Sequence, residues 1–172
     1  MKMSLMAARH DTPLLICYDG SENAAVAIEQ AATVLRDGPA LILSVWQPIS
    51  GVDSFAWLGT SPSMVDTFEL DRVAAEGGAR VAGEGVEIAR RAGLRAEPLA
   101  IEATGPVWKT ILETARAHDA RTIVLGSRGR TGLGLLLLGS VSGAVTHHAD
   151  RPVLVVHRPA TEEPPAHRAS AS

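Results

Sequence analysis

Short apolar runs alternate with longer segments of helical periodicity along this chain. Continuous apolar runs are typical of strands that are buried on both faces of a sheet. Two of the helical segments begin at residues that favour a helix start, Ser21 as an N-cap and Pro106 in a first turn. The pattern predicts strands at 13–18, 40–46, 94–101, 122–125 and 152–156, and helices that begin near 21, 66, 106 and 140.

This alternation predicts an α/β fold with one open, mostly parallel five-stranded sheet. A strand order of 3-2-1-4-5 would put Pro98 on an edge strand, where a missing N–H group is tolerated. The length of 172 residues suits one domain. We assign that domain to residues 13–158, with a loose segment at 1–12 and a disordered tail at 159–172.

The helix predicted for about 66–92 is unusual in its glycine content. Each glycine weakens a helix by roughly 1 kcal/mol relative to alanine. Small residues also allow a helix to pack closely on a sheet, which is a possible reason for them here. We predict the buried stripe of this helix at Leu70, Ala74, Gly77, Val81, Gly85 and Ile88.

Composition and charge narrow the classes of partner. The net charge of −3 provides no basic field for nucleic acid, and 3% aromatic residues are too few for base-stacking platforms. Cys17 is the single cysteine, which excludes a disulfide framework. No apolar run approaches the roughly 18 residues of a membrane span, and residues 1–11 lack the apolar core of a secretory signal. We therefore expect a cytoplasmic protein that binds neither membranes nor nucleic acid.

The stretch from Gly126 to Ser142 is the strongest candidate for a binding site. It contains five glycines, together with Arg128 and Arg130, between a predicted strand and a predicted helix. Glycines let a backbone approach a ligand closely, and the start of a helix favours an anion. The stretch therefore suits a phosphate chain, although a surface connection without a ligand is the plain alternative.

A second polar turn, Asp19-Gly20-Ser21, follows the first predicted strand. In the order 3-2-1-4-5, strands one and four flank the point where the strand order reverses, and ligands bind there in open α/β sheets. Asp19 would then accept hydrogen bonds from ribose hydroxyls while the glycine loop holds phosphates. A helix-capping role for Asp19 remains the alternative.

These residues also match a known family. The spacing G-2x-G-9x-G-(S/T) is formed by Gly126, Gly129, Gly139 and Ser140. Together with Asp19 after the first apolar run, this spacing resembles the ATP-binding branch of the universal stress proteins, over about residues 12–158. The resemblance implies a flavodoxin-like sheet with helices on both faces, and ATP with Mg²⁺ as the ligand. Gly143 stands where many members carry a basic residue, so a salt link is not expected there.

The resemblance also implies which residues bind the nucleotide. Asp19 would contact ribose, Tyr18 and Val45 would lie near adenine, and the glycine loop would line the phosphates. The implied set is Tyr18, Asp19, Val45, Leu125, Gly126, Arg128, Gly129, Gly139, Ser140, Val141 and Ser142.

The function expected from these features is a nucleotide-dependent stress-response switch. The glycine loop offers no Asp, Glu, Gln or His to position water, so we expect no catalytic residue and at most a weak ATPase. An apolar last strand favours pairing at a sheet edge, and members of the family commonly form dimers through it. We therefore expect a homodimer through residues 152–157 and a further, unidentified protein partner. Two alternatives remain: a nucleotide-free dimeric scaffold protein, and a small enzyme acting on a phosphorylated metabolite.

Overall fold

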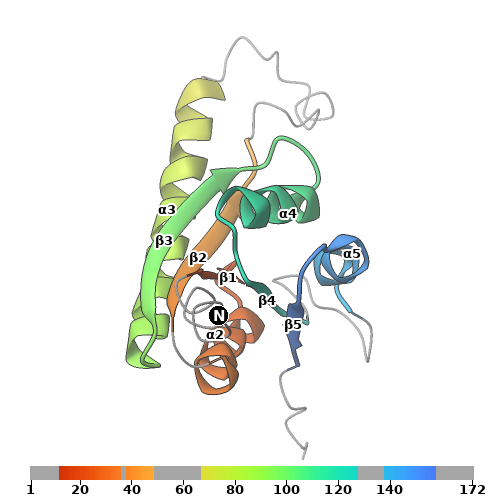
Figure 1. Cartoon of the computed structure of the whole chain (residues 1–172). Helices are drawn as coiled ribbons and strands as arrows, with labels where there is room; N and C mark the ends of the chain where they lie inside the picture. Colours follow the sequence, from red (N-terminus) through yellow and green to blue (C-terminus); the bar gives the residue numbers. More distant parts are fainter. Residues whose placement is uncertain (1–11, 36–37, 49–66, 128–137, 158–172) are drawn as a thin grey trace, which may run out of the picture.

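The computed structural model describes residues 12–35, 38–48, 67–127 and 138–157 (Figure 1). The strands are β1 (Leu14–Cys17), β2 (Pro39–Trp46), β3 (Arg95–Glu102), β4 (Thr122–Gly126) and β5 (Val153–Val156). The helices are α2 (Glu22–Val34), α3 (Thr67–Arg91), α4 (Val107–Ala117) and α5 (Ser140–His148). The order of elements predicted from the hydrophobic pattern is therefore confirmed. The predicted tail at 159–172, and all but the last residue of the predicted segment at 1–12, lie outside the described residues.

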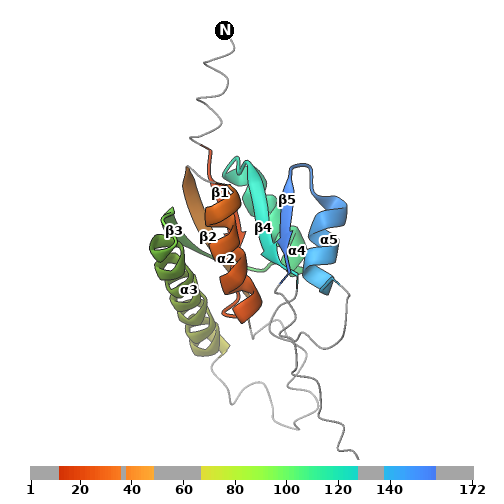
Figure 2. The ribbon, with the colours of Figure 1, turned by 90° about the horizontal axis from the view of Figure 1, so that it is seen from below.

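The five strands form one parallel sheet in the order β3-β2-β1-β4-β5 (Figure 2). The predicted order 3-2-1-4-5 is confirmed. Pro98 lies on the edge strand β3, in register with Ile42 of β2. An edge strand needs ladder hydrogen bonds on one side only, so the proline is tolerated there.

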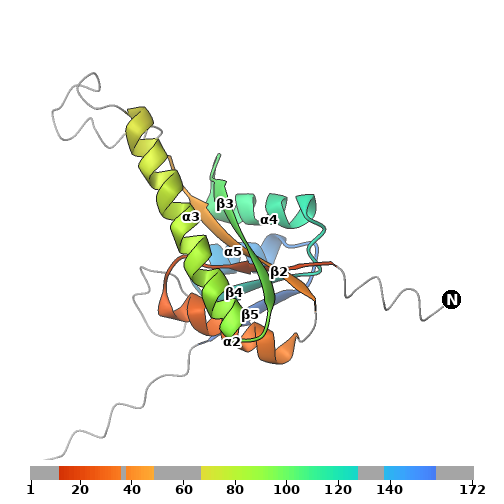
Figure 3. The same ribbon diagram turned by 90° about the vertical axis from the view of Figure 1, so that its left-hand side faces the viewer.

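Helices cover both faces of the sheet, and each face has its own hydrophobic core. Helices α2 and α3 cover one face, and α4 and α5 cover the other (Figures 2 and 3). Successive strand residues point to opposite faces. Leu14 and Ile16 therefore lie in the core under α2 and α3, which we call the first core, and Leu15 lies in the second core, under α4 and α5.

Two of the glycines in α3 allow the helix to lie close to the sheet. A Cβ atom added to Gly78 would lie 2.9 Å from Cδ1 of Trp46. A Cβ atom added to Gly85 would lie 2.6 Å from Cγ2 of Ile42. Close packing of small residues is therefore confirmed at these two positions, although a Cβ atom at Gly83 would meet nothing within 4 Å.

The buried stripe of α3 differs from the predicted one. The most buried positions of this helix are Gly78, Ala82, Gly85, Val86 and Ala89. The prediction followed the larger residues Val81 and Ile88, which are only partly buried and pack at the margin of the first core. Gly85 belongs to both stripes, and the reason for the difference is steric, because α3 approaches Trp46 and Ile42 of the sheet most closely at Gly78 and Gly85, where a Cβ atom has no room.

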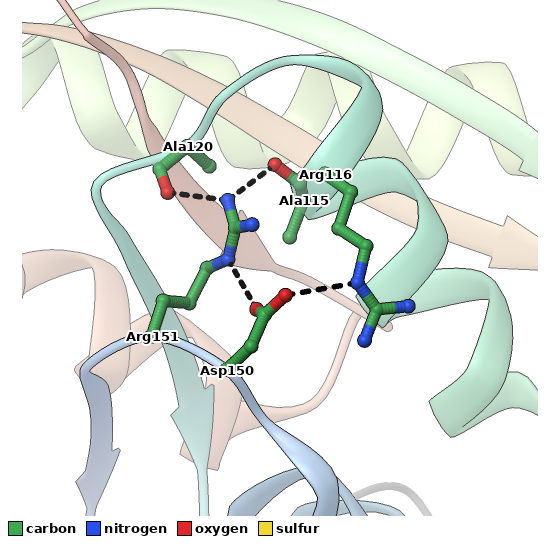
Figure 4. A network of polar contacts seen from close by, with 5 residues as sticks. All are labelled: Ala115, Arg116, Ala120, Asp150 and Arg151. Carbon is green, nitrogen blue, oxygen red and sulfur yellow. Dashed lines mark hydrogen bonds and ion pairs between the residues drawn. The ribbon is translucent and has the colours of Figure 1, made fainter.

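A polar network ties the end of α4 to the start of β5 (Figure 4). Nη1 of Arg151 donates to the carbonyl oxygens of Ala115 at 2.6 Å and Ala120 at 2.7 Å. Nε of Arg151 and Nε of Arg116 each donate to the Asp150 carboxylate, at 2.9 Å. Hydrogen bonds from Arg151 and Arg116 lower the pKa of Asp150 well below its usual range. The network fixes the edge of the sheet at the end remote from the glycine loop.

Candidate functional site

The carboxyl ends of β1 and β4 mark the point where the strand order reverses. β1 pairs with β2 on one side and with β4 on the other. The chain therefore leaves β1 and β4 toward opposite edges of the sheet, which is where open α/β folds bind ligands. The Asp19 turn follows β1 and Ser127 follows β4, so the two predicted halves of the site belong to neighbouring strands.

Asp19 helps to build the turn that starts α2. Its Oδ1 atom accepts a hydrogen bond from the backbone N–H of Ser21 at 3.0 Å. Gly20 between them has a φ of +83°, which suits glycine. The N-cap of α2 is Ser21, whose Oγ accepts from the N–H of Ala24 at 3.2 Å. The half-buried Asp19 carboxylate is thus held in a fixed direction without being the cap itself.

Three residues predicted near the base or beside the loop pack in or against the two cores. The Tyr18 ring packs in the first core, and burial, together with the negative charges of Glu84 and Asp19, raises its pKa. Leu125, only 4% exposed, lies in the second core, and the half-buried Val45 packs against that core. Tyr18 and Val45 therefore lie on opposite faces of the sheet, so their side chains do not form one surface.

Gly126, the first glycine of the spaced pattern, ends β4 directly against the start of α2. A Cβ atom at Gly126 would lie 3.0 Å from the carbonyl carbon and oxygen of Asn23, and 3.1 Å from the nitrogen of Ala24. These are backbone atoms, which cannot turn aside as a flexible side chain can. Close packing between β4 and α2 therefore favours glycine here, independently of any ligand.

Ser127 joins three pieces of the chain through its backbone. Its N–H donates to the carbonyl oxygen of Val156 at the end of β5, at 2.8 Å. Its carbonyl oxygen accepts from the N–H of Gly139 at 2.8 Å and from the hydroxyl of Ser142 at 3.0 Å. Sequence reasoning missed Ser127, because an isolated serine after a strand carries no recognisable pattern.

The start of α5 supplies the N–H groups that an anion would need. Gly139 is the N-cap, and the first intrahelical bond runs from the N–H of Gly143 to the Gly139 carbonyl at 2.8 Å. The N–H groups of Ser140, Val141 and Ser142 thus come before the first intrahelical bond, as at any helix start. Ser140 is exposed, Val141 is half-buried against the second core, and Ser142 is buried.

Two members of the predicted nucleotide set, Arg128 and Gly129, lie outside the described residues, and so does Arg130. The larger part of the long predicted loop, residues 49–66, also lies outside them. Among the described residues of the predicted set, Asp19 follows β1, whereas Gly139, Ser140 and Val141 lie at the start of α5, which hydrogen bonds to Ser127 hold to the end of the neighbouring strand β4.

Other reactive side chains have plain structural roles. His148 stacks on Trp108 with ring centroids 4.7 Å apart, and His147 meets His148 edge to face. Burial, with a smaller contribution from Asp19, raises the pKa of Cys17 to about 12, which favours the protonated, less nucleophilic thiol at neutral pH. Within the described ranges, no three His, Cys, Asp or Glu residues could hold a metal ion together. No helix found in those ranges is long and apolar enough to cross a bilayer.

A shallow groove of about 350 Å³ lies between α2 and the edge strand β5. Its lining is mostly apolar and consists of Val26, Gln30, Val34, Leu154, Val155, Val156 and His157. Val34 is 62% exposed there. The groove includes no residue of the Asp19 turn. From the sequence, we expected residues 152–157 at this edge of the sheet and did not expect a contribution from α2.

Comparisons with known proteins all point to the same family. Residues 12–157 match the family model described as "Universal stress protein family". The chain is 30% identical over 149 residues to universal stress protein MJ0531 of Methanocaldococcus jannaschii, covering 87% of this chain and 84% of that protein. Among solved structures, protein MJ0577 superposes with a TM-score of 0.68 at 23% identity, over 87% of this chain and 98% of that one.

Three similar structures contain an adenine nucleotide. The universal stress protein of Archaeoglobus fulgidus in complex with dAMP has a TM-score of 0.57 at 23% identity, over 84% of this chain and 96% of that one. A universal stress protein in complex with cAMP has a TM-score of 0.58 at 21% identity, over 85% and 97% of the two chains. A family protein from Arabidopsis thaliana with AMP bound has a TM-score of 0.57 at 20% identity, over 90% and 97%.

Proposed function

This chain belongs to the universal stress protein family, and we propose on that premise that it is a nucleotide-dependent switch that binds ATP. The observation that carries the proposal is the pairing of β1 with β4, which sets the Asp19 turn beside the strand that leads to the start of α5. The adenine nucleotides held by similar proteins support the class of ligand.

Each half of the site has a role that its chemistry suits. Asp19, held by its bond to the Ser21 N–H, would accept hydrogen bonds from ribose hydroxyls. The N–H groups at the start of α5 would hold phosphate oxygens, because this end of the helix carries a positive partial charge. Val45, at the end of β2, would form part of the wall near the base.

Mg²⁺ is part of the proposal as a companion of the phosphates. This ion usually keeps several waters and takes one or two carboxylates together with substrate phosphates. Asp19 is the one carboxylate among the described residues of the two turns, and one of its oxygens already accepts from Ser21. A cation that arrives with the nucleotide fits this donor set better than a preformed metal site does.

We also propose slow or no hydrolysis. Rapid phosphoryl transfer to water needs a group that positions the attacking water. Asp19 is assigned to the ribose end of the nucleotide, and the hydroxyl of Ser140 is not itself a base that could activate water. A cytoplasmic place of action belongs to the same proposal, since the single cysteine, Cys17, is a free thiol and requires no oxidising compartment.

The test is nucleotide binding by the purified chain, measured by calorimetry with ATP, ADP and AMP. We expect ATP to bind and Asp19→Asn to weaken it by about tenfold or more, because the variant keeps an oxygen for the Ser21 N–H but loses the charge. Gln47→Glu, at an exposed position after β2, is a control for changed surface charge. Absence of binding at about 1 mM of all three nucleotides would refute the proposal and favour a nucleotide-free scaffold protein.

For the partner, we propose a homodimer through residues 152–157, as part of a switch that also contacts an unidentified protein. The β5 edge and the apolar groove beside it support this assignment. Light scattering at micromolar concentration should give twice the mass of the chain. Val34→Glu in the groove should shift the protein toward monomer, whereas Val73→Glu, at a similarly exposed position on α3, should not. A monomeric wild-type protein would contradict the dimer.

A further inference from the structure

The side chain of Ser142, in the first turn of α5, points into the protein. It is only 4% exposed. Its Oγ atom donates toward two carbonyl oxygens, those of Ser127 at 3.0 Å and Gly139 at 3.2 Å. A hydroxyl has a single proton, so the two carbonyls share it. That proton is therefore already used inside the fold, although the resemblance to the family placed Ser142 among the residues lining the phosphates.

The two carbonyls belong to the two pieces of chain that form the proposed phosphate side. Ser127 is the first residue after β4, and Gly139 is the N-cap of α5. The N–H of Gly139 also donates to the Ser127 carbonyl, so two hydrogen bonds converge on one oxygen. Ser127 is itself fixed to β5 through the Val156 carbonyl. The first turn of α5 is in this way anchored to the sheet.

We propose that Ser142 is a positioning residue, which holds the N–H groups at the start of α5 against the end of β4 and does not touch the nucleotide. The inference rests on the proposed nucleotide binding for its effect on affinity. Its physical basis is pre-organisation, because a site already held in its binding geometry loses less freedom when the ligand arrives.

The change Ser142→Ala should leave the fold intact. The Ser127 carbonyl keeps the N–H of Gly139, and the Gly139 carbonyl keeps the N–H of Gly143, so neither acceptor is left unpaired. Thr146 offers a matched control one turn further along α5. Its hydroxyl donates to the Ser142 carbonyl at 2.8 Å, which is the same kind of bond without any contact to Ser127.

The first measurement is hydrogen exchange at the Gly139 amide in the protein without nucleotide. Ser142→Ala should speed this exchange by about three- to tenfold, the effect of losing one neutral hydrogen bond that supports it. Ser142→Thr should restore the wild-type rate to within about twofold, and Thr146→Ala should leave it unchanged. An unchanged rate in Ser142→Ala would overturn the inference whether or not the protein binds a nucleotide.

The second measurement is nucleotide affinity in a double-mutant cycle with Ser140→Ala. If Ser142 positions the helix start, the loss caused by Ser140→Ala should become smaller in the Ser142→Ala background. Two independent phosphate ligands would instead give additive losses, and that result would overturn the inference. A purely structural role would lower the melting temperature and leave the affinity at 25 °C unchanged. If the wild type binds no nucleotide, the proposed function fails, and the exchange experiment still tests the positioning of α5.

Discussion

Gly83 and Gly85 of α3 are expected to respond in opposite directions to the same substitution. Both lie in the interior of one helix, two residues apart. Replacing glycine by alanine in a helix stabilises it by roughly 0.5–1 kcal/mol, because the unfolded chain loses freedom. A Cβ atom at Gly83 meets nothing within 4 Å, so Gly83→Ala should gain this amount in free energy of unfolding.

At Gly85 the same methyl group enters a filled space. It would lie 2.6 Å from Cγ2 of Ile42 and 2.8 Å from Cδ1 of Tyr18, and both residues are buried in the first core. Overpacking of this kind costs about 1–3 kcal/mol. The gain in helix propensity is common to the two variants and cancels in their difference. Gly85→Ala should therefore be less stable than Gly83→Ala by about 1–3 kcal/mol.

Urea denaturation followed by circular dichroism measures this difference directly. For a chain of this size, 1 kcal/mol corresponds to about 2–4 °C in melting temperature, so thermal unfolding gives a second reading. Both variants should be compared at one protein concentration, because self-association makes apparent stability depend on concentration. Equal stability of the two variants would show that Gly85 does not determine how closely α3 approaches the sheet.

Three further changes test other parts of the structure. Gly126→Ala should destabilise the protein by about 1–3 kcal/mol in the absence of nucleotide, because the new methyl group meets the α2 backbone; unchanged denaturation would mean that α2 can move aside. Hydrogen bonds lower the pKa of Asp150, so its contribution is present above the ordinary carboxyl pKa of about 4 and is lost as pH falls toward the lowered value. The stability difference between wild type and Asp150→Asn should therefore shrink below about pH 4, and a difference that is independent of pH down to about 2 would contradict this account. Burial raises the pKa of Cys17 to about 12, so a thiol reagent at pH 8 should label the native protein much more slowly than the unfolded chain, and equal labelling rates would contradict the raised pKa.

The amino-acid sequence by itself predicted the order of elements, and its resemblance to a known family implied the topology of the sheet. Buried parallel strands must be apolar on both faces, so β1, β2, β4 and β5 appear as continuous apolar runs that differ from a helical pattern, whereas the edge strand β3 contains charged residues. Pro98 identified an edge strand because its missing N–H excludes it from the interior of a sheet. The glycine spacing and the Asp19 turn could also be recognised, since both are local in the sequence.

Only the tertiary structure decided what individual residues contact. Which glycines of α3 are needed depends on where the helix crosses the sheet, and a periodic pattern contains no such information. Gly126 was expected to leave room for a ligand, yet the nearest atoms to its missing side chain belong to α2, which lies about a hundred residues earlier in the chain. Ser142 lies two residues after the exposed Ser140, but its hydroxyl faces Ser127 inside the protein. Local sequence sets the conformation of a turn or a helix start, whereas the direction of a side chain depends on how distant elements pack around it.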